Sequence, residues 1–76
     1  MAQVMNDVRE RLLEGAAMSE LAEGAKAQIL AAGFNEIDYF ELRSADLVLL
    51  DKTEPNARLF AAAWLAGVRL IDNIEV

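Results

Sequence analysis

The sequence contains no cysteine and no histidine, and it has only one proline. Without cysteine the chain can form neither a disulfide nor a thiolate site. Without histidine it lacks the commonest general base near neutral pH and the commonest zinc ligand. A self-contained hydrolase triad, a zinc site and a redox site are therefore excluded, and no catalytic, cofactor-binding or metal-binding residue is predicted within the chain.

Basic residues are scarce as well, since seven lysines and arginines stand against thirteen acids, for a net charge of −6. Each contact with a phosphate needs a cation, so nucleic acid and anionic membrane surfaces are poor partners for this chain. No apolar run approaches the roughly 20 residues that span a bilayer. Residues 1–7 also lack the basic and apolar regions of a secretory signal. These absences predict a cytoplasmic protein.

Two helices are predicted in the first half of the 76 residues, a length that allows one domain with a small core. The first covers residues 2–14 and ends at Gly15. The second begins at Ser19 as its N-cap and ends at Gly33. Helical stripes of apolar residues support both helices: Val4, Met5, Val8 and Leu12 in the first, and Leu21, Ala25, Ile29 and Ala32 in the second. Gly24 lies inside the second helix and indicates that another element packs very close to it.

Three strands are predicted in the second half, over residues 36–42, 57–65 and 68–74. A short helical turn is expected at 44–47, an unclassified apolar patch at 47–50, and a loop at 51–56 around the single proline. The last two strands are joined by Ala66 and Gly67 alone, and a two-residue turn fixes the register of a hairpin. Leu65 must then face Val68, and Trp64 must face Arg69. The element order predicts a two-layer α+β fold, in which two N-terminal helices pack on one face of a three-stranded antiparallel sheet that ends in a β-hairpin.

The hairpin register divides its side chains between two faces of the sheet. The helix-covered face is expected to carry Leu59, Ala61, Ala63, Leu65, Val68, Leu70 and Ile74. Asp72 falls on this side too, so either a bulge re-aims it or its carboxylate accepts backbone N–H groups. The opposite face carries Arg58, Phe60, Ala62, Trp64, Arg69, Ile71, Asn73 and Glu75.

The uncovered face is too apolar for ordinary solvent exposure, and it is the predicted lid or interdomain surface. Its candidate residues are Arg58, Phe60, Trp64, Arg69 and Ile71. The alternative is that residues 47–50 or a chain end fold back and cover it. Glu36, Asp38 and Glu41 lie on the first strand without forming a same-face triad, and they are interpreted as solvated edge charges.

Two stretches carry a resemblance to a known family. Residues 61–76, AAAWLAGVRLIDNIEV, resemble the C-terminal signature of the pantothenate synthetase (pantoate-β-alanine ligase) family, in which an Ala-Ala-Trp-Leu-Gly hairpin runs into Arg-Leu-Ile-Asp-Asn. Residues 31–50, AAGFNEIDYFELRSADLVLL, are similar to the Gly-Phe, Ile-Asp-Tyr, Glu-Leu-Arg and Ala-Asp pattern of the same family. The family places glycine directly after the hairpin leucine, whereas here Ala66 precedes Gly67, so a different turn type is expected.

The resemblance implies that the chain is the C-terminal lid domain of a larger ligase. Such an enzyme condenses pantoate with β-alanine and uses ATP and Mg²⁺ to form a pantoyl-adenylate intermediate. Its chemistry lies in a preceding Rossmann-type domain with a His-x-Gly-His motif that this sequence lacks. The expected partners are that N-terminal catalytic domain and, in a homodimer, a second subunit. The alternative is a free-standing acidic module that binds a partner protein through Phe60, Trp64 and Ile71.

Overall fold

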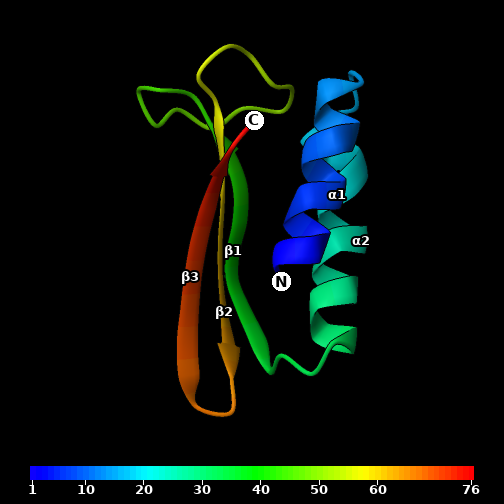
Figure 1. The fold of residues 1–76 in the computed structure, drawn as a ribbon, viewed down its shortest axis with the longest axis vertical. Helices are drawn as coiled ribbons and strands as arrows, with labels where there is room; N and C mark the ends of the chain where they lie inside the picture. The colour runs from blue at the N-terminus through cyan, green and yellow to red at the C-terminus, as the bar shows by residue number, and fades with distance from the viewer.

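The structure is a computed structural model that describes residues 1–76, and it has two helices followed by three strands. The helices are α1 (Ala2–Leu13) and α2 (Met18–Ala31), and the strands are β1 (Glu36–Arg43), β2 (Arg58–Leu65) and β3 (Val68–Glu75). The strands form one antiparallel sheet in the order β1-β2-β3. Both helices lie on the same side of this sheet (Figure 1). The predicted two-layer α+β fold is therefore confirmed.

The end of α1 follows from Gly15. This residue has a φ of +102°, which glycine adopts without strain. The Gly15 N–H donates to the Leu12 carbonyl at 3.0 Å, and the Ala16 N–H donates to the Arg11 carbonyl at 3.0 Å. These two bonds are the Schellman pattern that satisfies the last carbonyls of a helix.

The start of α2 differs from the prediction that Ser19 is its N-cap. The N-cap is Ala17, two residues earlier, and the helix begins at Met18. The Ala17 N–H donates to Glu20 Oε1 at 3.2 Å, and the Ser19 N–H donates to Asp51 Oδ1 at 2.9 Å. Asp51 lies in the loop between β1 and β2, so a residue distant in sequence supplies the acceptor that the serine hydroxyl was expected to provide. No pattern of neighbouring residues could reveal the contact between Ser19 and Asp51.

Two further expectations for α2 are wrong. Gly24 is exposed, and a Cβ placed on it would meet no atom within 4 Å, so no element packs closely there. Ala32 is the exposed C-cap of the helix and does not extend the buried stripe, which ends at Ile29.

The core lies between the helices and the covered face of the sheet. Twelve buried residues form it: Met5, Val8, Leu12, Met18, Ala25, Ile29, Phe40, Leu42, Ala57, Leu59, Ala61 and Ala63. Alanines on β2 allow the helix layer to approach the sheet, and the large side chains of β1 and the helices fill the space between them.

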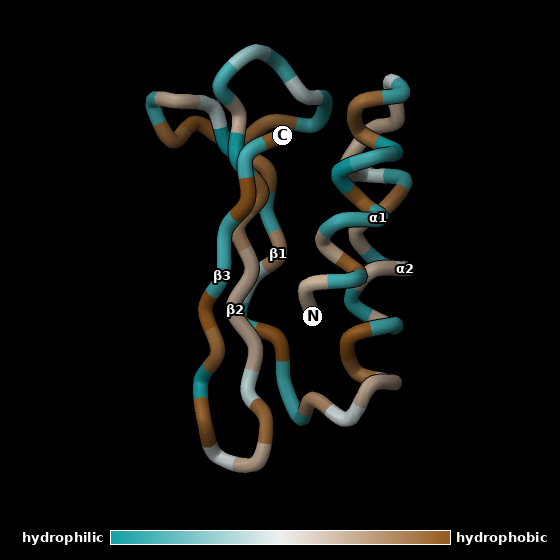
Figure 2. Tube along the Cα trace, viewed as in Figure 1, coloured by the Kyte–Doolittle hydropathy of each residue, from teal (hydrophilic) through white to brown (hydrophobic).

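The helices cover β1 and β2 but leave the end of the hairpin uncovered. Leu65, Val68 and Leu70 were predicted to press against the helices, yet they are 37%, 58% and 38% exposed. The hairpin turn lies at the lower end of the sheet, and β3 lies on the side farthest from α2 (Figure 1). In Figure 2 both strands are brown, the hydrophobic end of the scale, next to this turn. The predicted face is geometrically correct, but the helix layer does not reach the turn end of the hairpin, whereas Ile74 near the other end of β3 packs against the core.

The hairpin register agrees with the prediction at every pair. Leu65 lies opposite Val68, Trp64 opposite Arg69, and Phe60 opposite Asn73. Ala66 and Gly67 have φ values of +51° and +81°. Positive φ at both central residues is the type I′ turn, whose twist matches that of the flanking strands. Ala66 therefore occupies a conformation that usually selects glycine or asparagine.

The predicted helical turn at 44–47 is a β-turn instead. The Leu47 N–H donates to the Ser44 carbonyl at 2.9 Å, and the Ser44 N–H donates to the Val48 carbonyl at 2.9 Å. Leu47 has a φ of +65°, and Leu49 forms an antiparallel bridge with Arg43. This is a three-residue reversal with a left-handed third residue. The apolar patch at 47–50 thus folds back along the edge of β1, with Leu47, Val48 and Leu49 exposed.

Candidate functional site

The candidate site is the face of the sheet that the helices do not cover, which we call the open face. The register pairs residues of all three strands on it: Tyr39, Glu41 and Arg43 of β1; Arg58, Phe60, Ala62 and Trp64 of β2; and Arg69, Ile71, Asn73 and Glu75 of β3. All five predicted site residues therefore lie on one face.

The centre of the open face is apolar. Ala62 lies between Tyr39 and Ile71 in the register and is fully buried, while Phe60 and Trp64 are half-buried. Ile71 is 59% exposed. No helix or terminal segment lies across this surface (Figure 1), so an apolar surface with a charged border remains accessible.

A bulge in β1 brings Asp38 to one end of this face. Ile37 pairs with Ala63 and Tyr39 with Ala62, which leaves Asp38 without a partner on β2. Its carboxylate accepts the indole N–H of Trp64 at 3.2 Å and the Nε–H of Arg69 at 2.7 Å. Asp38 thereby fixes the two predicted site residues that face each other across the hairpin. Its interpretation as a solvated edge charge was wrong, because a bulge cannot be inferred from alternation alone.

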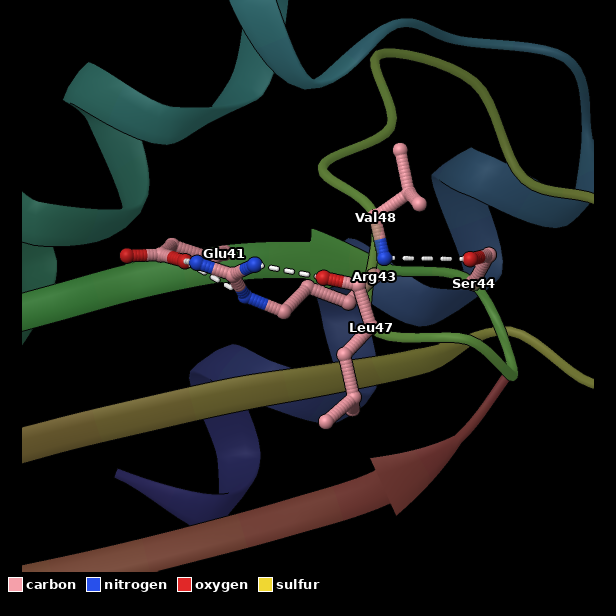
Figure 3. A network of polar contacts seen from close by, with 5 residues as sticks. All are labelled: Glu41, Arg43, Ser44, Leu47 and Val48. Atoms are coloured by element: carbon pink, nitrogen blue, oxygen red, sulfur yellow. Dashed lines mark hydrogen bonds and ion pairs between the residues drawn. The ribbon is translucent and has the colours of Figure 1, made fainter.

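The opposite end of the face is organised around Arg43. Its Nη2 lies 2.6 Å from Glu41 Oε2, and its Nη1 donates to the Leu47 carbonyl at 2.6 Å (Figure 3). The Ser44 hydroxyl accepts the Val48 N–H at 3.1 Å in the same turn. These bonds hold the turn after β1 against the border of the open face.

Leu47 also lines a shallow pocket of about 260 Å³. The remaining lining residues are Tyr39, Glu41, Arg43 and Phe60. The alternative that residues 47–50 fold back over the open face is thus realised at this one end. It does not extend to Ile71, which stays mostly exposed.

Three of the seven cations of the chain lie on the open face, and their partners differ. Arg43 and Arg69 form ion pairs with carboxylates. Arg58 donates its Nε–H to the neutral side-chain oxygen of Asn73 at 2.9 Å and forms no ion pair. Arg58 also lies directly opposite Arg43 in the register. Glu75 lies opposite Arg58 on β3 but forms no ion pair with it, so Arg58 is the one guanidinium of the open face without an ion-pair partner.

The sequence-based site was incomplete on the side of β1. Asp38, Tyr39, Glu41 and Arg43 belong to the same surface but were not among its candidate residues. The hairpin turn fixes the register of β3 on β2, whereas nothing local fixes the register of β1, which is separated from β2 by a 14-residue connection. The strict alternation of Tyr39, Glu41 and Arg43 was the only available signal.

Of the two alternatives expected for Asp72, a bulge or a carboxylate that accepts backbone N–H groups, the structure shows the second. No bulge interrupts β3, and the Asp72 carboxylate accepts the N–H of Asn73 at 2.8 Å. No three histidine, cysteine, aspartate or glutamate side chains converge as a metal site. No helix is long and apolar enough to cross a bilayer.

Comparison with known proteins gives consistent results over the whole chain. A family model described as pantoate-beta-alanine ligase matches residues 1–75. A pantothenate synthetase of Roseobacter denitrificans is 56% identical over 77 residues, which cover 100% of this chain and 27% of that protein. No solved structure was found to match the chain.

Two other relatives carry the same name. The pantothenate synthetase of Ruegeria pomeroyi is 57% identical over 74 residues, or 96% of this chain and 26% of that protein. That of Cereibacter sphaeroides is 48% identical over 77 residues, or 100% of this chain and 28% of that protein. The chain thus spans about a quarter of the length of these relatives. None of the three names describes a free-standing interaction module, so that alternative gains no support.

Proposed function

Because the chain belongs to the pantoate-β-alanine ligase family, we propose that it is the C-terminal domain of such a ligase and acts there as a lid. The observation that carries this proposal is a family match over residues 1–75 in a chain that spans 27% of a named pantothenate synthetase. The complete enzyme would condense pantoate with β-alanine and consume ATP through a pantoyl-adenylate intermediate. The C-terminal position rests on the hairpin signature of residues 61–76.

In this proposal ATP and Mg²⁺ bind outside the 76 residues, in a preceding Rossmann-type domain. The residues present do not fit either role, because the carboxylates of the open face are held by arginines and no metal-binding group of three converges. The chain alone would then be inactive as a ligase. The enzyme would work in the cytoplasm.

The open face is the surface by which the domain would meet its partner. Phe60, Trp64 and Ile71 supply apolar area opposite the helix layer, and polar residues surround them. Interdomain surfaces have this composition, with an apolar centre and a polar border. The first partner is the N-terminal catalytic domain of the same polypeptide, and the second subunit of a homodimer is the other surface that this face could meet.

Arg58 and Arg69 are the two predicted site residues that could meet a polyanionic substrate when the lid closes, and their contacts differ. Arg69 is held by Asp38 at 2.7 Å, and the same carboxylate accepts the indole N–H of Trp64 at the border of the face. Arg58 donates to the neutral Asn73 and forms no ion pair with Glu75, which lies opposite it on β3. We therefore assign Arg58 to the contact with the polyanionic substrate, since a new ion pair at Arg58 breaks no existing ion pair.

A chimera tests this function directly. The matching 27% of the Roseobacter denitrificans synthetase is replaced by residues 1–76, and pantothenate formation is compared with that of the same synthetase truncated before the matched region. We expect the chimera to be active, the truncated enzyme to be inactive and the 76-residue chain alone to be inactive. A truncated enzyme as active as the chimera would contradict a lid, and turnover by the isolated chain would contradict its assignment as non-catalytic.

A further inference from the structure

Both edges of a β-sheet present unpaired backbone groups to solvent, and a small protein must prevent other strands from adding there. At the β1 edge the chain solves this with its own backbone. Leu49 bridges Arg43, and the Leu50 N–H donates to the Leu42 carbonyl at 2.9 Å. The Asp38 bulge interrupts the remainder of that edge.

The β3 edge has no covering segment, and its exposed groups follow from the register. Leu65 and Val68 flank a two-residue turn and therefore form a hydrogen-bonded pair, after which bonded and non-bonded pairs alternate. The bond from the Val76 N–H to the Ala57 carbonyl, at 3.0 Å, agrees with this alternation. Residues 69, 71, 73 and 75 consequently direct their N–H and C=O groups away from β2.

Two of these outward groups are occupied by side chains. The Asn73 N–H donates to the carboxylate of Asp72 at 2.8 Å. The Glu75 carbonyl accepts the Nε–H of Arg9, which reaches across from α1, at 2.8 Å. Arg69 and Ile71 are thus the two residues that keep both outward groups free of protein partners, whereas Asn73 keeps only its carbonyl free and Glu75 only its N–H. Two residues offer too short a strip for a stable strand pair.

We propose that Asp72 and Arg9 close the β3 edge to strand addition by a second copy of the chain, with the hydrogen bond from Asn73 to Asp72 as the principal barrier. A second copy is the partner to exclude because β3 is complementary to itself. In the antiparallel register that uses all four outward residues, Arg69 faces Glu75 of the second copy and Ile71 faces its Asn73. That register requires the Asn73 N–H that Asp72 occupies.

The strand is otherwise well suited to association. Val68 and Ile71 are 58% and 59% exposed on opposite faces of it, so both faces would gain buried area on pairing. In the same register the two Asp72 carboxylates would lie directly opposite each other, and like charges in that position repel. The experiment must therefore separate the hydrogen bond from the charge.

Three variants of the chain make this separation. Asp72→Ala removes both the acceptor and the charge, and Asp72→Asn keeps an acceptor oxygen without the charge. Glu54→Ala removes one exposed charge from the loop between β1 and β2. Amide exchange at Asn73 is measured at low concentration, and mass is measured by sedimentation velocity over a wide concentration range. An NMR spectrum of each variant first verifies that the sheet is folded.

We expect Asp72→Ala to exchange the Asn73 amide about fivefold faster, consistent with the loss of one hydrogen bond. Its mass should rise toward twice that of the monomer as concentration increases, and further so in combination with Arg9→Ala. Asp72→Asn and Glu54→Ala should remain monomeric. The proposal would be overturned if the Asp72→Ala variant stayed monomeric, or if the Glu54→Ala variant associated as strongly as Asp72→Ala. Asp72→Asn that associates like Asp72→Ala would overturn the role given to the hydrogen bond.

Discussion

Replacing Ala66 by asparagine should stabilise the protein, because Ala66 has a φ of +51° in the type I′ turn. An L-residue with a Cβ loses roughly 1 to 2 kcal/mol in the left-handed region, whereas asparagine adopts it more readily through local hydrogen bonds. The Ala66 side chain is exposed, so no packing is lost, and the bond from its N–H to Asn35 Oδ1 at 3.0 Å involves only the backbone of residue 66. The expected gain is about 1 kcal/mol in the free energy of unfolding.

Thermal unfolding followed by circular dichroism measures this gain. For a domain of this size about 1 kcal/mol raises the melting temperature by roughly 4 to 8 °C. Ala27→Asn is the matched control, since Ala27 is also exposed but lies inside α2, where asparagine lowers stability by about 0.5 kcal/mol. If Ala66→Asn melted no higher than the unchanged chain, the strain assigned to this turn would be refuted.

Three further predictions concern the packing and the open face. Gly24→Ala should raise the free energy of unfolding by about 1 kcal/mol, because the added Cβ meets no atom within 4 Å, and a decrease in a denaturant titration would reveal a contact that the structure lacks. Leu42→Ala should lower it by about 3 kcal/mol, since Leu42 is fully buried, and a loss below about 1 kcal/mol would place that side chain outside the core. Asp38→Ala should lower the free energy of unfolding by about 1 kcal/mol, because it removes the ion pair with Arg69. In a double-mutant cycle, Arg69→Ala should lower this free energy less in the Asp38→Ala background than in the unchanged chain, and strictly additive losses would show that the two side chains do not interact.

The sequence predicted those parts of the fold that depend on neighbouring residues. A two-residue turn dictated every pair of the hairpin, and Gly15 and Gly33 marked both helix ends. The errors arose where distant residues decide the local structure. Asp51 supplies an acceptor at the start of α2 from 32 positions away, and the partner strand, through the bulge at Asp38, decides which way the side chains of β1 point.

The candidate site likewise has a part that local sequence predicted and a part that it did not. All of its predicted residues came from the hairpin, where register is local, and all lie on the open face. The β1 contribution was missed because it depends on pairing across a long connection. The exposure of Leu65 and Val68 was also missed, since alternation predicts a face but not how far a helix layer extends over it.

The kinetics of Ile71→Ser in the chimera test the proposal that the open face serves a ligase as an interdomain surface. Ile71 is 59% exposed, so its replacement should leave the melting temperature nearly unchanged, and Leu13→Ser, at a 53% exposed position on the helix layer, is the control. We predict that Ile71→Ser lowers kcat/KM at least about fivefold, equivalent to about 1 kcal/mol of transition-state stabilisation, while Leu13→Ser leaves it unchanged. Equal kcat/KM for the chimera and Ile71→Ser, at equal melting temperature, would contradict the account.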